Sequence, residues 1–160
     1  MEKKFELTDK FVINAFGIKL FQIKCTKSFK YANEGDLGGY VEKEDNLSQS
    51  GDAWVSGDAQ VYGDALVSGD AQVYGNARVY GNARVENNHM HCGFDCFGSC
   101  NRHTHAYKTK GNKVEITCGC FRGNIEEFER KVEETHSGTI YEKQYKAIIN
   151  LIKIKFGIDG

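Results

Sequence analysis

The chain has 160 residues, 18 glycines and no proline, and its formal net charge at pH 7 is -1. So small a net charge favours neither a nucleic-acid polymer nor an acidic membrane surface as a partner. The sequence has no apolar run long enough to span a bilayer, and residues 1–6 lack the apolar core of a signal peptide. We therefore expect a cytoplasmic protein whose six cysteines are mostly reduced thiols rather than a disulfide framework.

Residues 1–36 predict an N-terminal β cap. Two apolar runs, residues 11–13 and 18–23, have the composition of short strands, and residues 14–17 between them have the composition of a turn. A hairpin at this place would cover the open end of the repeated segment that follows it, because a stack of repeats leaves backbone groups unpaired at both ends.

Residues 51–87 repeat with a period of six, in the pattern V-x-G-[DN]-A-x. Self-similarity at a fixed short period is typical of a stacked repeat. Valine suits a pleated wall, and glycine followed by aspartate or asparagine suits a turn that needs positive φ. The recurring apolar positions are Val55, Val61, Val67, Val73, Val79 and Val85, together with Ala53, Ala59, Ala65, Ala71, Ala77 and Ala83.

This pattern resembles the hexapeptide repeat of left-handed parallel β-helix proteins. The resemblance implies that three repeats form one triangular coil, that the valines point inward and that the alanines fill the corners. It also implies a homotrimer, the usual assembly of that family. We expect a mainly β fold with a β cap at 1–36, the β-helix at 37–92 and an α+β module of a hairpin and two helices at 93–160.

Two further motifs flank the repeats. The run GDLGGYVEKEDNLS at residues 35–48 and the run VEITCGCFRGNIEEF at residues 114–128 resemble the start and the end of small hexapeptide-repeat proteins found in bacteriophages. The resemblance implies that the protein works in the cytoplasm of an infected bacterial host cell. It implies no particular activity.

The residue before each repeated valine is expected to point outward. Residues eighteen apart stack in such a coil, which pairs Trp54 with Gln72, Gln60 with Arg78, and Leu66 with Arg84. The residues after each valine lie at the corners, where Tyr62 is expected to stack on Tyr80 and Ser56 on Tyr74.

Most exposed positions of a coil are plain surface or subunit contact, and we assign Trp54 and Leu66 to that role. For Arg78, Arg84, Tyr74 and Tyr80 a second interpretation is open. Arginine forks beside aromatic faces can hold an anionic ligand that contains a ring.

Residues 88–107 are rich in cysteine and histidine, which raises the question of zinc. No C-x-x-C pair occurs, so we favour Cys92 and Cys96 as small buried residues that finish the coil core, and we predict no metal. Ser99, Asn101 and Tyr107 resemble a loop and strand of the phage proteins.

Residues 114–121 alternate like a strand, with a hairpin turn at 110–113. Cys118 and Cys120 would share one face, where core packing is favoured over a redox pair. Asn124 is a candidate N-cap for a helix that ends near Gly138, with Ile125, Phe128 and Val132 on its apolar face. A second helix is expected over 139–155, with a stripe of Tyr141, Tyr145, Ile148 and Ile152 widened by Leu151 and Phe156.

Three functional classes compete for this chain. An acyltransferase or a carbonic-anhydrase-like zinc enzyme on this fold needs histidines on the coil, and residues 51–88 contain none. We therefore predict a non-enzymatic protein that sequesters a small anionic, nucleotide-derived ligand, a signal of host defence, in pockets between the subunits of a trimer. An acyltransferase-like enzyme and a purely structural trimeric protein remain the alternatives. No cofactor and no catalytic residue are predicted. The expected ligand-binding residues are Arg78, Tyr80, Arg84, Ser99, Asn101, Arg102, His103 and Tyr107.

Overall fold

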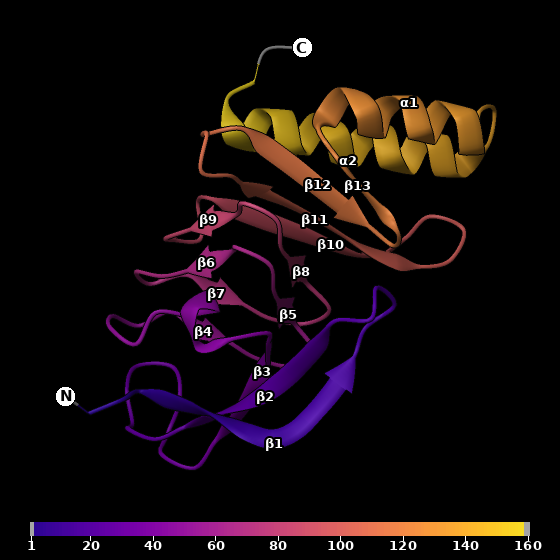
Figure 1. Cartoon of the computed structure of the whole chain (residues 1–160). Coiled ribbons are helices and arrows are strands. Elements are labelled where there is room, and N and C mark those ends of the chain that lie inside the picture. The colour runs from indigo at the N-terminus through magenta and orange to yellow at the C-terminus, as the bar shows by residue number, and fades with distance from the viewer. Residues whose placement is uncertain (1, 159–160) are drawn as a thin grey trace. The chain divides into compact units, whose positions relative to one another are not determined.

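The computed structural model describes residues 2–158 and is mainly β (Figure 1). The chain divides after Asn88 into two compact units, a little before the boundary predicted after residue 92. Neither helix in the described part of the chain has the length and apolar character needed to cross a membrane.

The repeated segment of the first unit forms a two-residue strand every six residues. These strands are β4 (Trp54–Val55), β5 (Gln60–Val61), β6 (Leu66–Val67), β7 (Gln72–Val73), β8 (Arg78–Val79) and β9 (Arg84–Val85). Strands β4 and β7, β5 and β8, and β6 and β9 pair in parallel, so the predicted stacking of residues eighteen apart is confirmed. The six repeated valines and six repeated alanines are all buried, which confirms the predicted interior.

The repeat depends on glycine at its turns. Gly51 has φ of +70°, which L side chains rarely adopt, and a Cβ added there would lie 2.6 Å from the carbonyl oxygen of Gly69. Backbone hydrogen bonds continue through the turns between successive layers, as from Asp58 N to Gly75 O at 3.0 Å. The missing side chain therefore lets the turns stack as closely as the strands.

The predicted hairpin cap is confirmed and is longer than expected. β1 (Phe5–Ile13) pairs antiparallel with β2 (Lys19–Cys25), and β2 pairs antiparallel with β3 (Leu37–Val41). β3 in turn pairs in parallel with β5, so the sheet order is β1-β2-β3-β5-β8. The side chain of Asn14 forms the turn by accepting hydrogen bonds from the backbone N–H groups of Phe16 and Ile18.

Two buried polar side chains satisfy carbonyls that the hairpin leaves without a strand partner. Lys4 Nζ donates to Ala53 O at 2.6 Å, and burial lowers the pKa of this amine to about 8. Asn46, at the end of the short 3-10 helix η1 (Glu44–Asn46), donates from Nδ2 to Ala65 O at 2.9 Å. The edge of the coil is therefore closed by side chains as well as by strands.

The prediction that Trp54 lies on an exposed side is wrong. Trp54 is 5% exposed, and the ring of Phe29 packs edge-on against it with the ring centroids 5.3 Å apart. Phe29 belongs to the segment between β2 and β3, where its backbone N–H donates to Ala32 O. Trp54 points out of the coil, but this segment covers it.

The second unit is an antiparallel sheet with two helices on one face (Figure 1). Its strands are β10 (His91–Phe97), β11 (Arg102–Lys108), β12 (Val114–Cys118) and β13 (Phe121–Gly123), followed by α1 (Ile125–His136) and α2 (Ile140–Phe156). The core between sheet and helices consists of Ala106, Val114, Ile116, Cys118, Ile125, Phe128, Val132, Tyr145, Ile148, Ile149 and Ile152. The predicted hairpin turn and the two helices are thus confirmed.

The helix boundaries follow from local sequence. Asn124 accepts a hydrogen bond from Glu127 N at 2.8 Å, and the Glu127 carboxylate accepts one from Asn124 N at 3.2 Å, so the expected capping box is present. Gly138, with φ of +79°, follows the end of α1. The prediction for Leu151 is wrong, since this side chain is 53% exposed, because Ile149 rather than Leu151 completes the buried stripe of α2.

Of the four predicted cysteine positions, one is confirmed and three are wrong. Cys118 is buried in the core under the helices, as expected. Cys96 and Cys120 are exposed, contrary to prediction, because Cys96 lies in a bulge of β10 with φ of +68° and Cys120 lies in the turn after β12. Cys92 does not finish the coil core either: it packs against the helix core of the second unit.

Candidate functional site

The second unit contains a pocket of about 540 Å³, which is within the range of small-molecule sites. It opens where the β10–β11 and β12–β13 turns meet the two helices. Its lining residues are Ser99, Cys100, Arg102, Cys118, Cys120, Phe121, Arg122, Phe128, Lys131, Val132, Thr135, His136 and Tyr145.

The charged lining of this pocket is basic. Arg102 comes from the start of β11, Arg122 from β13 and Lys131 from α1, and His136 adds a titratable ring at the end of α1. Among the described residues that line the pocket, none is an aspartate or a glutamate. Arg122 forms an ion pair with Glu115, which lies on the neighbouring strand. Arg122 pairs with Thr117, and Glu115 pairs with Tyr107, so this ion pair lies on the face of the sheet away from the helices. The positive charge on the concave surface therefore comes from Arg102 and Lys131.

The other wall of the pocket is aromatic. The ring of Tyr145 lies edge-on to Phe128 at 5.6 Å and stacks on His136 at 5.5 Å, measured between ring centroids. Phe121 packs against Phe128 at 5.1 Å. Phe128 and Tyr145 are buried, and they hold the half-buried rings of Phe121 and His136 in place, on which a planar group can stack.

Arg102 is held by the two turns that form the rim. Gly119, in the β12–β13 turn, has φ of +59°, and a Cβ added there would overlap Arg102 Nη1. From that position Arg102 Nη2 donates to Cys100 Sγ at 3.8 Å. The hydrogen bonds from Arg102 and then Ser99, with the charge of Arg102, lower the pKa of the Cys100 thiol.

Cys118 and the hydroxyl of Tyr145 also line the pocket. Cys118 Sγ accepts a hydrogen bond from Thr104 Oγ1 at 3.2 Å and lies 3.7 Å from the hydroxyl of Tyr145. Burial and the adjacent Cys118 raise the pKa of Tyr145, so this hydroxyl stays protonated and can donate.

Of the predicted site residues in the second unit, the structure brings Ser99 and Arg102 together in the pocket. Asn101 lies beside them in the same turn, exposed, with φ of +50°. His103 and Tyr107 lie on the opposite face of β11 from Arg102, because side chains alternate along a strand and Ala106 packs under the helices. These residues are close in sequence, but the alternation of side chains along β11 places Arg102 on one face of the sheet and His103 and Tyr107 on the other.

The remaining predicted residues belong to the first unit. The ring of Tyr80 stacks on Tyr62 with centroids 4.6 Å apart and an interplanar angle of 8°, which confirms the expected tyrosine pair. This pair is buried with Tyr40 and Leu20 beneath the hairpin. Arg84 Nη1 donates to Asp64 O at 2.6 Å. Arg78 is half-buried and lies opposite Gln60 on the neighbouring strand.

The residues that sequence reasoning missed come mainly from α1. Lys131, Thr135 and His136 follow Phe128 at helical spacing, so they continue the same face of the helix beyond its buried part. The sequence pattern predicts Ile125, Phe128 and Val132 as the apolar face of this helix, and these three residues are buried. Polar residues that continue the apolar face of α1 at helical spacing are the sequence signal that could have indicated a site here.

Three histidines and one aspartate form a row on the opposite face of the sheet. His91 Nδ1 lies 2.9 Å from His105 Nε2, His105 Nδ1 lies 2.9 Å from His103 Nε2, and His103 Nδ1 lies 2.6 Å from Asp95 Oδ1. An ionised carboxylate only accepts, so a row of neutral rings has its proton on Nδ1 in each histidine. Burial, then the neighbours His91 and His103, lower the pKa of His105 well below 6.5.

Within residues 2–158, no group of three or more histidine, cysteine, aspartate or glutamate side chains is arranged to hold a metal ion.

Comparison with known proteins bears on the coil alone. Residues 59–75 and 71–87 match the family model of the YdcK beta solenoid repeat, so the repeated segment is similar to the repeats of a β-solenoid family. No curated protein matches the chain significantly. The match ends before the second unit, whose pocket must be interpreted from its own geometry.

Proposed function

We propose that the protein is a non-enzymatic binding protein and that the pocket of its second unit takes up a small anionic ligand containing a planar ring. The observation that carries this proposal is that Arg102 and Lys131 line a pocket with an aromatic wall, in which no described lining residue is acidic. Electrostatic complementarity of this kind selects anions and repels cations.

The donor types narrow the ligand further. A guanidinium presents a planar fork of N–H groups that matches the oxygens of a phosphate, and it does not deprotonate in proteins. Phe121 and His136, both half-buried in the lining of the pocket, offer ring surfaces for stacking. A volume of about 540 Å³ suits one mononucleotide-sized molecule. These features together support a nucleotide-derived ligand.

The narrower parts of the proposal rest on sequence resemblance. The phage-like runs at residues 35–48 and 114–128 support a protein that sequesters a defence signal of an infected bacterial cell. The repeat pattern of residues 51–87 supports a left-handed coil and a homotrimer, as in the proteins it resembles. In such an assembly the three second units would offer three equal sites, and a neighbouring subunit would complete each one.

Thermal shift with a panel of linear and cyclic nucleotides tests the ligand class, because a ligand that binds the native state raises its stability by mass action. Calorimetry then compares Arg102→Gln with wild type for the nucleotide that gives the largest shift. Arg102 is exposed, so loss of its contact with a phosphate should weaken binding by about 1.4 kcal/mol, roughly tenfold in Kd.

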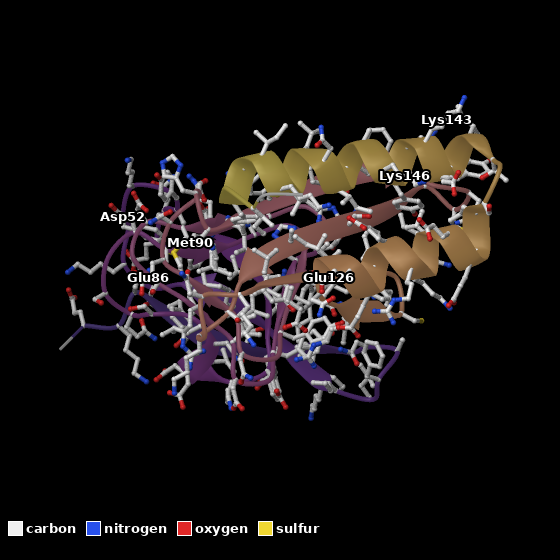
Figure 2. All side chains as sticks on the ribbon, turned by 90° about the horizontal axis from the view of Figure 1, so that it is seen from above. Asp52, Glu86, Met90, Glu126, Lys143 and Lys146 are labelled. Atoms are coloured by element: carbon white, nitrogen blue, oxygen red, sulfur yellow. The ribbon has the colours of Figure 1, made fainter. Side chains whose placement is uncertain are left out.

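Lys143→Gln serves as the charge-matched control. Lys143 is exposed on α2, two residues before Tyr145 and so on the opposite side of the helix, and Figure 2 shows it pointing away from α1. This variant should bind as wild type does. A panel without any shift, or equal affinity of Arg102→Gln and Lys143→Gln, would contradict the proposed function.

A further inference from the structure

The six cysteines differ sharply in their surroundings. Cys25 and Cys118 are buried, and Cys92 is half-buried, with its pKa raised to about 11 by burial. Cys96, Cys100 and Cys120 are exposed. Since the thiolate is the reactive form and must be accessible, only the last three are candidates for chemistry.

Cys100 differs from the other exposed cysteines in its hydrogen-bond donors. Arg102 Nη2 and Ser99 Oγ each lie 3.8 Å from its sulfur. In the described part of the chain, neither Cys96 nor Cys120 has a cationic donor on its sulfur. A guanidinium beside a thiol favours the thiolate, and the hydroxyl of Ser99 can donate a second bond to it.

The position of Cys100 matters as much as its partners. Cys100 lines the rim of the basic pocket together with Arg102. Arg102 fits there because Gly119 has no Cβ to overlap its guanidinium. An anionic molecule attracted into the pocket by Arg102 and Lys131 therefore arrives next to this sulfur.

We propose that Cys100 is a nucleophilic thiol that undergoes exchange with small anionic disulfides. The Cys100 thiolate attacks one sulfur of the disulfide, a new S–S bond forms to Cys100, and the original S–S bond breaks. The second half of the disulfide leaves as a thiolate. The small disulfide that is attacked is the oxidant, and an added small thiol reverses the reaction.

The product places an anionic group covalently at the rim of the pocket. This consequence rests on the proposed function: a mixed disulfide at Cys100 should occupy the space that the nucleotide needs. The thiol state would then decide whether the pocket is open to its ligand. The reactivity itself is independent of that step.

The probe is 5,5′-dithiobis(2-nitrobenzoate), an aromatic disulfide with two carboxylates, and the readout is absorbance of the released thionitrobenzoate. Wild type should show one fast thiol followed by slower ones. The fast phase should be lost in Cys100→Ser and kept in Cys96→Ser. Its rate should fall less than the rates of the slower thiols when the pH is lowered from about 8 to about 6.5, because the hydrogen bond from Arg102 lowers the pKa of Cys100.

The role of Arg102 is tested by a second comparison. Arg102→Gln should slow the fast phase at least tenfold, and Lys143→Gln should leave it unchanged. The Arg102→Gln substitution should slow the reaction with an uncharged disulfide, bis(2-hydroxyethyl) disulfide, less than the reaction with the anionic probe. The uncharged reagent is not attracted by Arg102, so its reaction rate falls only because the thiol is less activated.

The proposal is overturned if the fast phase survives in Cys100→Ser or is lost in Cys120→Ser instead. Equal rates at the three exposed thiols would also overturn it. No nucleotide takes part in these measurements, so this result and the binding test can fail separately. Circular dichroism of each variant shows whether it is folded.

Discussion

Arg102 connects the two proposals, and its position depends on a glycine that it touches. Gly119 occupies the β12–β13 turn with φ of +59°, and the guanidinium of Arg102 fills the space where a Cβ would project. One backbone position thus sets both the basic character of the pocket and the environment of Cys100.

Gly119→Ala should therefore displace Arg102. We expect the affinity of the pocket for its nucleotide and the rate of the Cys100 fast phase to fall together, and the free energy of unfolding to drop by about 1 kcal/mol from the left-handed φ. Calorimetry, the disulfide assay and urea unfolding measure the three effects. Gly111→Ala is the control, because no atom lies within 4 Å of a Cβ added there. Wild-type behaviour of Gly119→Ala in the first two assays would contradict this role.

At the scale of elements, the register of β10 against β11 produces the histidine row. Gly93 lies opposite His105, and a Cβ on Gly93 would come within 2.6 Å of the His103 ring. The rings are close enough to share protons only because this position is a glycine. Thr117, opposite His105 on β12, is buried as well.

This row makes stability sensitive to acid. The pKa of His105 is lowered well below 6.5 in the folded protein, so the unfolded chain takes up its proton first as the pH falls. The contribution of His105 to stability is present above about 6.5 and is lost below it, at up to roughly 1.4 kcal/mol per pH unit.

Urea unfolding between pH 7 and pH 5 tests this expectation. The free energy of unfolding should fall more steeply with decreasing pH in wild type than in His105→Gln, which cannot titrate. His89→Gln, a change at an exposed histidine outside the row, should keep the wild-type slope. Parallel pH profiles for wild type and His105→Gln would show that the row does not resist protonation.

At the scale of the whole molecule, the proposed trimer is the feature most open to test. Leu66 is half-buried on one side of the coil and lies next to Arg84 of the following layer. If that side is the subunit contact, Leu66→Glu should convert the trimer to a monomer, because it places a charge in an apolar contact. Native mass spectrometry measures the oligomeric state.

Gln60→Glu makes a similar change on another side of the coil and should remain trimeric. A monomeric wild-type protein would overturn the trimer. Trp54→Glu is unsuitable for this purpose, since Trp54 is buried against Phe29 and the change would disturb the fold itself.

The sequence by itself determined the parts that repeat or that depend on near neighbours. A period of six with valine, alanine and glycine at constant offsets specifies which residues stack, and the pairs Trp54–Gln72 and Tyr62–Tyr80 follow directly. The capping box at Asn124 is equally local. In these cases each interaction joins positions whose separation along the chain is set by the geometry of one element.

Only the tertiary structure decided the burial of Trp54, the histidine row and the pocket. The segment that carries Phe29 reaches Trp54 by its path through space, which no periodicity encodes. The histidine row depends on a strand register. The pocket collects side chains from two turns and two helices, and the pleat of β11 sends Arg102 toward them and His103 away. Convergence of residues from separate elements is set by their packing, whereas a single sequence specifies chiefly the elements themselves.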